Sequence, residues 1–497
     1  MTRRFSKSKL LAFRQCPKRL WLEVHKPELR VDSGAEVSMS VGNEVGAIAR
    51  ALYDPEAQGI LINAQEEGFE KALERSRSLL SGNAPIFEAG FATSEAIAFA
   101  DILLPVSANT WRMVEVKSAT GVKDYYLDDA AIQFNVARSA GVPLQSIAIA
   151  HIDSSWTYPG DKHYNGLLIE VDVTQEASAR TADVQDWIIE ASAIASLPTE
   201  PKKSTGAHCS KPFECSFWSY CKSQEPQAER PVGWLPRLQR KETKDYIETK
   251  SIIDMSDVPD EYLNDIQKRV KAHTLSGTTY FDAKGAADAL KAHPLPALFL
   301  DFESVNLAIP VWKGTRPYQQ IPFQFSLHHV SDAGVLSHTE FLDLSGDDPC
   351  RPFAQALIQS CAVAGPIFVY KRTFEAGRIR ELAEMFSDLE ASLIAIIDRL
   401  VDLLPIATKF YYHPSQAGSW SIKKVLPAIA PDLDYAKLPG VKDGEMASVA
   451  YREAIQSATS PVRKDEIRAQ LSAYCSLDTY AMVRLWAFFA GRSDLQL

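Results

Sequence analysis

The sequence predicts an α/β protein with more than one domain. Apolar segments typical of buried strands alternate with amphipathic segments of helical period in both halves of the chain. A chain of 497 residues is too long for one hydrophobic core, so two or three domains are expected. Hydrophobic residues make up 46% of the chain and charged residues 23%, which is typical of a globular protein.

The composition also restricts the class of protein. The chain has no run of about 18 apolar residues, which predicts no membrane-spanning helix. Its basic N-terminus lacks the apolar stretch of a secretory signal, so we expect a cytoplasmic location. Because the net charge is −10, contact with nucleic acid would need local basic patches. One candidate patch, which a solvated helix face explains equally well, consists of Arg3, Arg4, Lys7, Lys9, Arg14, Lys18 and Arg19.

The first half of the chain reads as a mixed sheet with helices. We predict helices at 5–26, 37–53, 64–80, 127–140 and 177–197. We predict strands at 85–91, 146–152 and 166–173, and a β-hairpin at 100–117.

The hairpin carries a group of ionisable side chains. Glu115 and Lys117 are two residues apart on one strand and share a face, which Asp101 on the partner strand can reach. The two carboxylates offer the oxygen ligands that a hard divalent cation prefers. Lys117 could orient or deprotonate a metal-bound water, or stabilise charge on a phosphate. An ion pair on a solvated strand face would give the same short pattern.

Three of the seven cysteines, Cys209, Cys215 and Cys221, follow a C-x5-C-x5-C spacing. Disulfides are rare in the cytosol, so closely spaced thiols there indicate a metal or a cluster. Cys16 is the available fourth ligand. Four thiolates would hold an iron–sulfur cluster. Zinc could use the same four or exchange one for His208, but its ligand pairs are usually closer in sequence.

Residues 1–222 resemble the RecB-like branch of the PD-(D/E)xK nucleases, and more closely the CRISPR-associated RecB-like nucleases and the AddB nuclease domain. The matching residues are Cys16 in FRQCPKRLW, Asp101, Glu115, Lys117, Gln133, Cys209, Cys215 and Cys221. The resemblance implies a restriction-endonuclease-like fold with a Mg²⁺ or Mn²⁺ site and a 4Fe-4S cluster that joins the domain ends. It makes Asp101, Glu115, Lys117 and Gln133 catalytic. Glu44 would be a further metal ligand, where many members have His.

Two positions depart from that family. Ala100 precedes Asp101 where members have Pro, and Ala137 stands four residues after Gln133 where a Tyr is common. Neither departure removes a metal ligand. Residues 223–292 then read as a helical connector without a metal-ligand grouping.

Residues 293–497 read as strands followed by helices. The apolar strand LPALFLDFES places Asp301 and Glu303 on one face, an arrangement that is costly when buried unless a cation lies between them. A strand meander and a fourth strand follow, and then a helix with Glu375 near its start. In the last predicted helix, 466–489, Tyr474 and Asp478 are one turn apart on one face.

These segments resemble the DEDD exonucleases, the DnaQ-like branch of the ribonuclease H fold. The matches are FLDFE with Asp301 and Glu303, and YCSLD with Tyr474 and Asp478. Members usually have Asp after the aromatic residue of the middle motif, where this chain has Glu375. The resemblance implies two Mg²⁺ or Mn²⁺ ions at the four acids, with Tyr474 orienting the attacking water. The longer Glu375 implies a rearranged or weaker site.

Together the resemblances imply a bacterial two-nuclease family. The expected activity is metal-dependent hydrolysis of phosphodiester bonds in DNA at two sites, in DNA repair, CRISPR-like processing or anti-phage defence. The sequence has no G-x4-GK[ST] motor loop, so single-stranded ends are the expected partner. Two alternatives stay open. The protein could be a ribonuclease, or its C-terminal domain could only bind nucleic acid while the RecB-like domain cuts.

Overall fold

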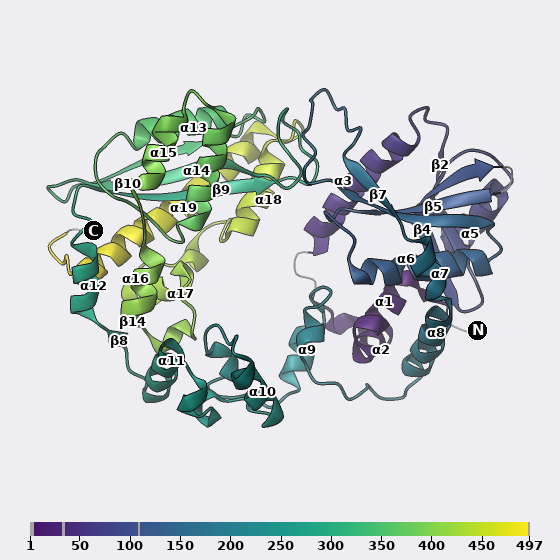
Figure 1. Cartoon of the computed structure of the whole chain (residues 1–497), viewed down its shortest axis with the longest axis horizontal. Helices are drawn as coiled ribbons and strands as arrows, with labels where there is room; N and C mark the ends of the chain where they lie inside the picture. The colour runs from purple at the N-terminus through teal and green to yellow at the C-terminus, as the bar shows by residue number, and fades with distance from the viewer. Residues whose placement is uncertain (1–3, 32–34, 108–109, 496–497) are drawn as a thin grey trace. The chain divides into compact units, whose positions relative to one another are not determined.

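The computed structural model describes residues 4–31, 35–107 and 110–495 (Figure 1). The chain forms two compact units. The first contains Met1–Pro226 and Leu307–Tyr318, and the second contains Gln227–Asn306 and Gln319–Leu497. The segment predicted as a connector therefore packs within the second unit, and a short segment from the second half of the sequence belongs to the first. Both units combine sheets and helices, so the predicted α/β class is confirmed.

A seven-stranded mixed sheet forms the centre of the first unit. Its strands run in the order β2 (Ile60–Leu61), β3 (Ile86–Ala92), β4 (Ala96–Ser107), β5 (Thr110–Lys117), β6 (Leu144–Ile152) and β7 (Leu168–Asp172), and β1 (Phe5–Ser6) pairs with β4. The predicted hairpin is β4 and β5, with Ile102 opposite Val114, while β5 and β6 are parallel. The turn residues 108–109 lie outside the described residues.

The first unit also contains α-helices, and those nearest the sheet lie on both of its faces. The helices are α1 (Lys7–Gln15), α2 (Pro17–His25), α3 (Ala35–Tyr53), α4 (Ala64–Glu67), α5 (Phe69–Leu79), α6 (Asp124–Ser139), α7 (Thr174–Ala179), α8 (Thr181–Ala195) and α9 (Trp218–Ser223). Helices α1 and α6 share a core with Trp111 and Met113 of β5. Ala49 of α3 packs with Val114 on the opposite face. Residues 111, 113, 115 and 117 of β5 therefore face α1 and α6.

Two predicted helices are each divided in the structure. The helix expected at 5–26 breaks at Cys16, which is extended with φ −163° and ψ 122°. Pro17 follows Cys16, and a residue before proline disfavours the helical conformation. The helix expected at 64–80 breaks at Gly68, where φ is +87°. Each break follows from the local chemistry of proline or glycine, which helical periodicity alone does not register.

A five-stranded sheet forms the centre of the second unit. Its order is β11 (Leu336–Leu342), β10 (Gln320–Val330), β9 (Ala297–Asn306), β12 (Ile367–Val369) and β13 (Leu400–Asp402). Strands β9, β10 and β11 form the predicted antiparallel meander, whereas β12 and β13 run parallel to β9. A small ribbon pairs β8 (Tyr280–Phe281) with β14 (Tyr411–Tyr412).

The helices of the second unit are α10 (Lys241–Thr249), α11 (Asp265–Ser276), α12 (Ala283–Leu290), α13 (Cys350–Ser360), α14 (Thr373–Met385), α15 (Glu390–Asp398), α16 (Leu403–Phe410), α17 (Ile422–Ile429), α18 (Gly444–Ala454) and α19 (Pro461–Ala490). Phe353 of α13 contacts Phe302 on one face of β9, and Trp486 of α19 contacts Phe299 on the other. Residues 299, 301 and 303 therefore face α19.

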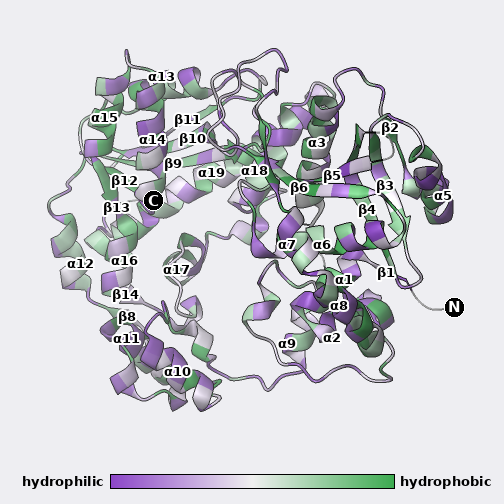
Figure 2. Ribbon diagram, turned by 45° about the vertical axis from the view of Figure 1, so that its right-hand side comes forward, coloured by the Kyte–Doolittle hydropathy of each residue, from purple (hydrophilic) through white to green (hydrophobic). Residues whose placement is uncertain are grey.

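Hydropathy follows this layering. Figure 2 shows mainly hydrophobic residues on the central strands, whereas exposed helices such as α10 are largely hydrophilic. Across the described ranges, no helix combines the length and the apolar character needed to cross a lipid bilayer.

Candidate metal centres

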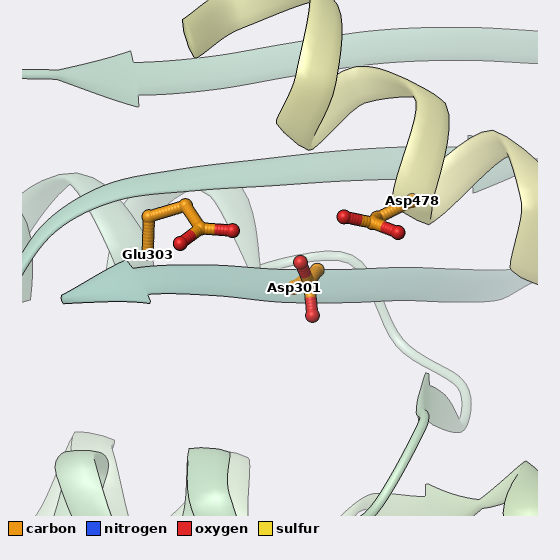
Figure 3. A group of neighbouring side chains, drawn as sticks. All are labelled: Asp301, Glu303 and Asp478. Carbon is orange, nitrogen blue, oxygen red and sulfur yellow. The ribbon is translucent and has the colours of Figure 1, made fainter. Parts of the chain in front are cut away.

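Three carboxylates converge between β9 and α19. Asp301 and Glu303 project from β9, and Asp478 projects from α19 toward them (Figure 3). One ligand oxygen from each residue lies within 4.8 Å of the other two. Glu303 and Asp478 are each only 7% exposed. The cluster is a compact set of oxygen donors of the kind that Mg²⁺ and Mn²⁺ prefer.

Burial and mutual repulsion disfavour the ionised forms of these carboxyls. Burial, followed by the neighbouring charges of Asp478 and Glu303, raises the pKa of Asp301 well above its usual value. Burial and Asp478 raise the pKa of Glu303 to about 8. Burial also raises the pKa of Asp478 to about 6, although a hydrogen bond from Tyr435 opposes the shift. A bound cation would reverse these penalties, because it is the largest local charge in such a site.

Glu375 lies near this cluster but outside the group whose oxygens are within 4.8 Å. It occupies the first turn of α14 and is 2% exposed. Its charge contributes to the raised pKa of Asp301, and burial raises its own pKa to about 8. Its buried Oε2 atom has no hydrogen-bond partner among the described groups. An unsatisfied buried carboxylate oxygen is costly, and a cation beside the cluster would satisfy it.

Tyr474 completes the set predicted in this unit, and two further residues accompany it. Tyr435 donates a hydrogen bond from its hydroxyl to Oδ1 of Asp478 at 2.5 Å. Lys423 Nζ donates to the Tyr474 hydroxyl at 3.4 Å and lies 5.3 Å from the centroid of the Tyr435 ring. Sequence reasoning missed Lys423 and Tyr435, because they come from α17 and a following turn, which carry no recognisable motif.

Replacing Tyr435 with phenylalanine is expected to raise, by about one unit, the pH at which the carboxylate cluster takes up a divalent cation. The hydroxyl stabilises the ionised form of Asp478, and a hydrogen bond to a charged group contributes roughly 1.5 kcal/mol. Without it the pKa of Asp478 rises, so the carboxylate that a cation needs forms at higher pH. Mn²⁺ affinity measured from pH 5 to 9 tests this. Tyr451→Phe, another buried tyrosine of this unit, is the control and should leave the pH dependence of the affinity unchanged.

The four residues predicted on the hairpin and on α6 also come together. Lys117 donates to Oε1 of Glu115 at 2.7 Å, and Gln133 donates to Oε2 of Glu115 at 2.5 Å. The carboxylate of Asp101 accepts a hydrogen bond from the backbone N–H of Val116 at 2.7 Å. Alternation on β5 turns Glu115 and Lys117 toward α1 and α6 as a pair, as the spacing predicts.

Two residues that the sequence did not single out for chemistry join this group. Lys7 of α1 lies 2.9 Å from Oε1 of Glu115 and 3.1 Å from Oδ1 of Asp129. Lys117 forms a further ion pair with Asp129. Burial alone would raise the pKa of Glu115, but the ammonium groups of Lys117 and Lys7 lower it. Asp129 stands one helical turn before Gln133, and that spacing was the available signal for it.

Glu44 does not accompany these residues. It is exposed on α3, the helix that packs on the opposite face of the sheet. The side chain that contacts Glu115 from a helix is Lys7, a residue of the predicted basic patch. Other members of the patch are also ion-paired, among them Arg4 with Glu70, Arg14 with Asp128 and Lys18 with Glu200. Arg3 lies outside the described residues.

The four cysteines predicted as ligands surround one small pocket. Cys16 stands at the break between α1 and α2, and Cys209, Cys215 and Cys221 come from the segment that ends in α9. Burial raises the pKa of Cys221 to about 11, and the other three thiols act on the same group. His208 Nε2 lies 3.6 Å from Sγ of Cys209.

The four thiols differ from the carboxylate cluster in one respect. Among the residues that the structure describes, the group of Asp301, Glu303 and Asp478 brings three ligand atoms within 4.8 Å of one another, and the cysteines form no such group. Both zinc and an iron–sulfur cluster take four thiolates, so the choice between them stays a prediction.

Comparisons with known proteins give one family match and several distant relatives. Residues 298–421 match the family described as Domain of unknown function (DUF2779). The chain is 23% identical over 218 residues to Uncharacterized protein UU173 of Ureaplasma parvum, a match covering 40% of this chain and 31% of that protein. It is 24% identical over 211 residues to Uncharacterized protein MG366 of Mycoplasma genitalium, covering 38% of this chain and 31% of that protein. Each match spans about a third of the relative's length.

Proposed function

We propose that the chain is a metal-dependent nuclease that hydrolyses phosphodiester bonds of single-stranded DNA at two sites. The observation that carries this proposal is the convergence of Asp301, Glu303 and Asp478, with the buried Glu375 beside them. Burying several carboxyls together without compensation costs several kcal/mol, and binding divalent cations would offset that cost. A pair of such cations is suited to displacement at a phosphate.

The order of elements supports a DnaQ-like assignment of the second unit. The central strand carries Asp301 and Glu303, an antiparallel meander follows, and α14 carries Glu375. The long final helix then brings Tyr474 and Asp478 back to the central strand. This is the order of motifs on which the resemblance to the DEDD exonucleases depends.

The side chains of this site have distinct proposed roles. Bound Mg²⁺ or Mn²⁺ would supply activation of water and stabilisation of the leaving oxygen. Asp301, Glu303 and Asp478 would hold the ions, and Tyr435 would keep the Asp478 carboxylate ionised and oriented. Tyr474 would orient the attacking water, and the Lys423 ammonium beside its hydroxyl keeps positive charge close to the scissile phosphate.

A second site is proposed in the first unit, as in the RecB-like PD-(D/E)xK nucleases. Asp101 and Glu115 would hold Mg²⁺ or Mn²⁺ there, and Lys117 would act on the attacking water or the phosphate. Gln133 fixes the carboxylate plane of Glu115 through its amide N–H. Lys7 and Lys117 together compensate the charges of Glu115 and Asp129.

We also propose that the four cysteines bind a 4Fe-4S cluster rather than zinc. Replacing Cys16 with alanine is then expected to remove the iron and to lower the melting temperature by roughly 5–15 °C, because a structural metal contributes directly to folding. Iron and acid-labile sulfide assays, with a thermal melt, measure both effects. The control is Cys361→Ala, a buried thiol outside the pocket. Zinc without iron in the anaerobically purified protein would contradict the proposal.

The experiment that tests the nuclease function compares end-labelled single-stranded DNA and RNA oligonucleotides in Mg²⁺ or Mn²⁺. Wild type, Lys117→Ala, Asp301→Ala and the double variant are assayed side by side. We expect each single variant to lose a distinct set of DNA products and the double variant to be inactive. Faster cleavage of RNA would favour a ribonuclease. Complete loss in Lys117→Ala alone would mean that the second unit only binds nucleic acid. An active double variant would overturn the proposal.

A further inference from the structure

A cavity of about 560 Å³ lies within the second unit, apart from the carboxylate cluster. Its volume falls in the range of small-molecule binding pockets, about 300–1,000 Å³. The predicted connector supplies one wall, and the segments around β12, α16 and α17 supply the other. The lining residues that matter for its chemistry are Arg237, Ile266, Tyr370, Lys371, Leu404 and Trp420.

The cavity combines an apolar and aromatic interior with positive charge. Trp420 is almost completely buried, and its carbonyl accepts a hydrogen bond from the Tyr370 hydroxyl at 2.5 Å, which fixes the two residues together. Ile266 and Leu404 are partly buried, whereas Arg237 and Lys371 are exposed. A ligand that suits this lining has a flat apolar part and a negatively charged part.

The two basic residues are held in unusual backbone conformations. Arg237 has φ +49° and Lys371 has φ +84°, a region that residues with a Cβ seldom adopt. The backbone after Tyr370 is fixed because the carboxylate of Asp402 accepts hydrogen bonds from the N–H groups of Lys371 and Arg372, each at 3.0 Å. Such conformations concentrate at ligand-binding segments.

Two residues that line the cavity stand close in sequence to residues that lie beside the carboxylate cluster. Lys371 stands four residues before Glu375 in the segment that begins α14. Ile422 also lines the cavity, and the next residue, Lys423, reaches the hydroxyl of Tyr474. A nucleic-acid strand with one phosphate at the cluster could therefore place a neighbouring nucleotide at the cavity.

We propose that this cavity binds one nucleotide of the substrate strand. The base lies against the partly exposed side chains of Tyr370, Ile266 and Leu404, and the phosphate is held by Arg237 and Lys371. Stacking on aromatic side chains holds bases without regard to sequence, and guanidinium groups match phosphate geometry. The place of this nucleotide on the substrate rests on the proposed function of the carboxylate cluster.

Calorimetric titration with thymidine 5′-monophosphate tests the binding directly, in buffer without divalent metal. We expect binding by the wild-type chain and at least tenfold weaker binding by Ile266→Trp, which fills the cavity, and by Arg237→Glu, which reverses its charge. Arg240→Glu is the matched control on the same segment and outside the cavity. Inorganic phosphate and thymidine should each bind more weakly than the nucleotide. No binding by wild type, or equal binding by Ile266→Trp, would overturn the proposal.

Cleavage kinetics of the same variants separate this inference from the nuclease proposal, and every variant here also carries Lys117→Ala, which silences the proposed site of the first unit. On single-stranded DNA, Arg237→Glu and Ile266→Trp should raise KM about tenfold and leave kcat nearly unchanged, with melting temperatures verifying the fold. If Asp301→Ala stops cleavage in this background but neither cavity variant changes nucleotide binding or KM, the nuclease site stands and the nucleotide cavity is wrong. If the cavity variants lose nucleotide binding while Asp301→Ala in this background cleaves normally, the cavity stands and the assignment of the carboxylate cluster is wrong.

Discussion

Replacing Asp301 with asparagine is expected to lower the cleavage rate of the site in the second unit at least a thousandfold and, at the same time, to stabilise the metal-free protein. Asp301 is the member of the carboxylate cluster whose ionised form is opposed by burial and by three neighbouring carboxyls. Loss of a metal-binding oxygen removes about 4 kcal/mol of transition-state stabilisation when the rate falls a thousandfold. Loss of a buried like charge relieves repulsion, which we expect to add about 1–2 kcal/mol to the free energy of unfolding.

The measurement needs a background in which only the site in the second unit can act. Single-turnover cleavage of labelled single-stranded DNA by Lys117→Ala is compared with the Lys117→Ala, Asp301→Asn double variant, and thermal melts in EDTA are recorded for both. Asp332→Asn makes the same chemical change on an exposed loop and should alter neither quantity. Unchanged cleavage by the double variant would exclude Asp301 from the chemistry. A lower melting temperature would show that Asp301 is compensated without metal.

The stability of the metal-free protein is expected to fall as the pH rises from 6.5 to 8. Burial raises the pKa values of Glu303 and Glu375 to about 8, whereas both are near 4.5 in an unfolded chain. The folded state therefore binds more protons than the unfolded state in this window, and raising the pH removes stability. Each carboxyl that stays protonated in the folded state lowers the free energy of unfolding by up to about 2 kcal/mol as the pH rises from 6.5 to 8.

The buried His328 acts outside this window. Burial lowers the pKa of His328 to about 4. Between pH 4 and the ordinary histidine pKa of about 6.5, the unfolded state therefore binds the extra proton, and the free energy of unfolding rises with pH there. Melts from pH 6.5 to 8 in EDTA, repeated with 5-fold and 50-fold excess Mn²⁺, provide the measurement. Mn²⁺ should restore more stability at pH 8 than at pH 6.5. Glu303→Gln should flatten the dependence in EDTA, and an unchanged slope in that variant would contradict the assignment.

Local patterns in the sequence predicted many of the residues that come together at both candidate sites. Strand alternation correctly placed Asp301 and Glu303 on one face that meets Asp478. Helical spacing correctly placed Tyr474 beside Asp478. The break at Cys16 could have been predicted from Pro17. The contact between Lys7 and Glu115 could not be predicted, because it spans 108 positions and depends on how α1 packs over β5. Lys423 and Tyr435 were missed for the same reason.

Residues 307–318 lie in the second half of the sequence but belong to the first unit, so cutting the chain would not separate the proposed activities cleanly. The chain crosses from one unit to the other after Pro226, after Asn306 and after Tyr318. Ala308 of the returning segment packs with Val45 and Ile152, and the hydroxyl of Tyr318 donates to the carbonyl of Ser118, next to Lys117. A truncation at residue 226 would therefore expose part of the first unit's core. After a single proteolytic cut at residue 226, the C-terminal fragment would still carry residues 307–318, which pack in the first unit. Point substitutions can therefore switch off one proposed centre at a time, whereas a truncation would destabilise the unit that it was meant to isolate.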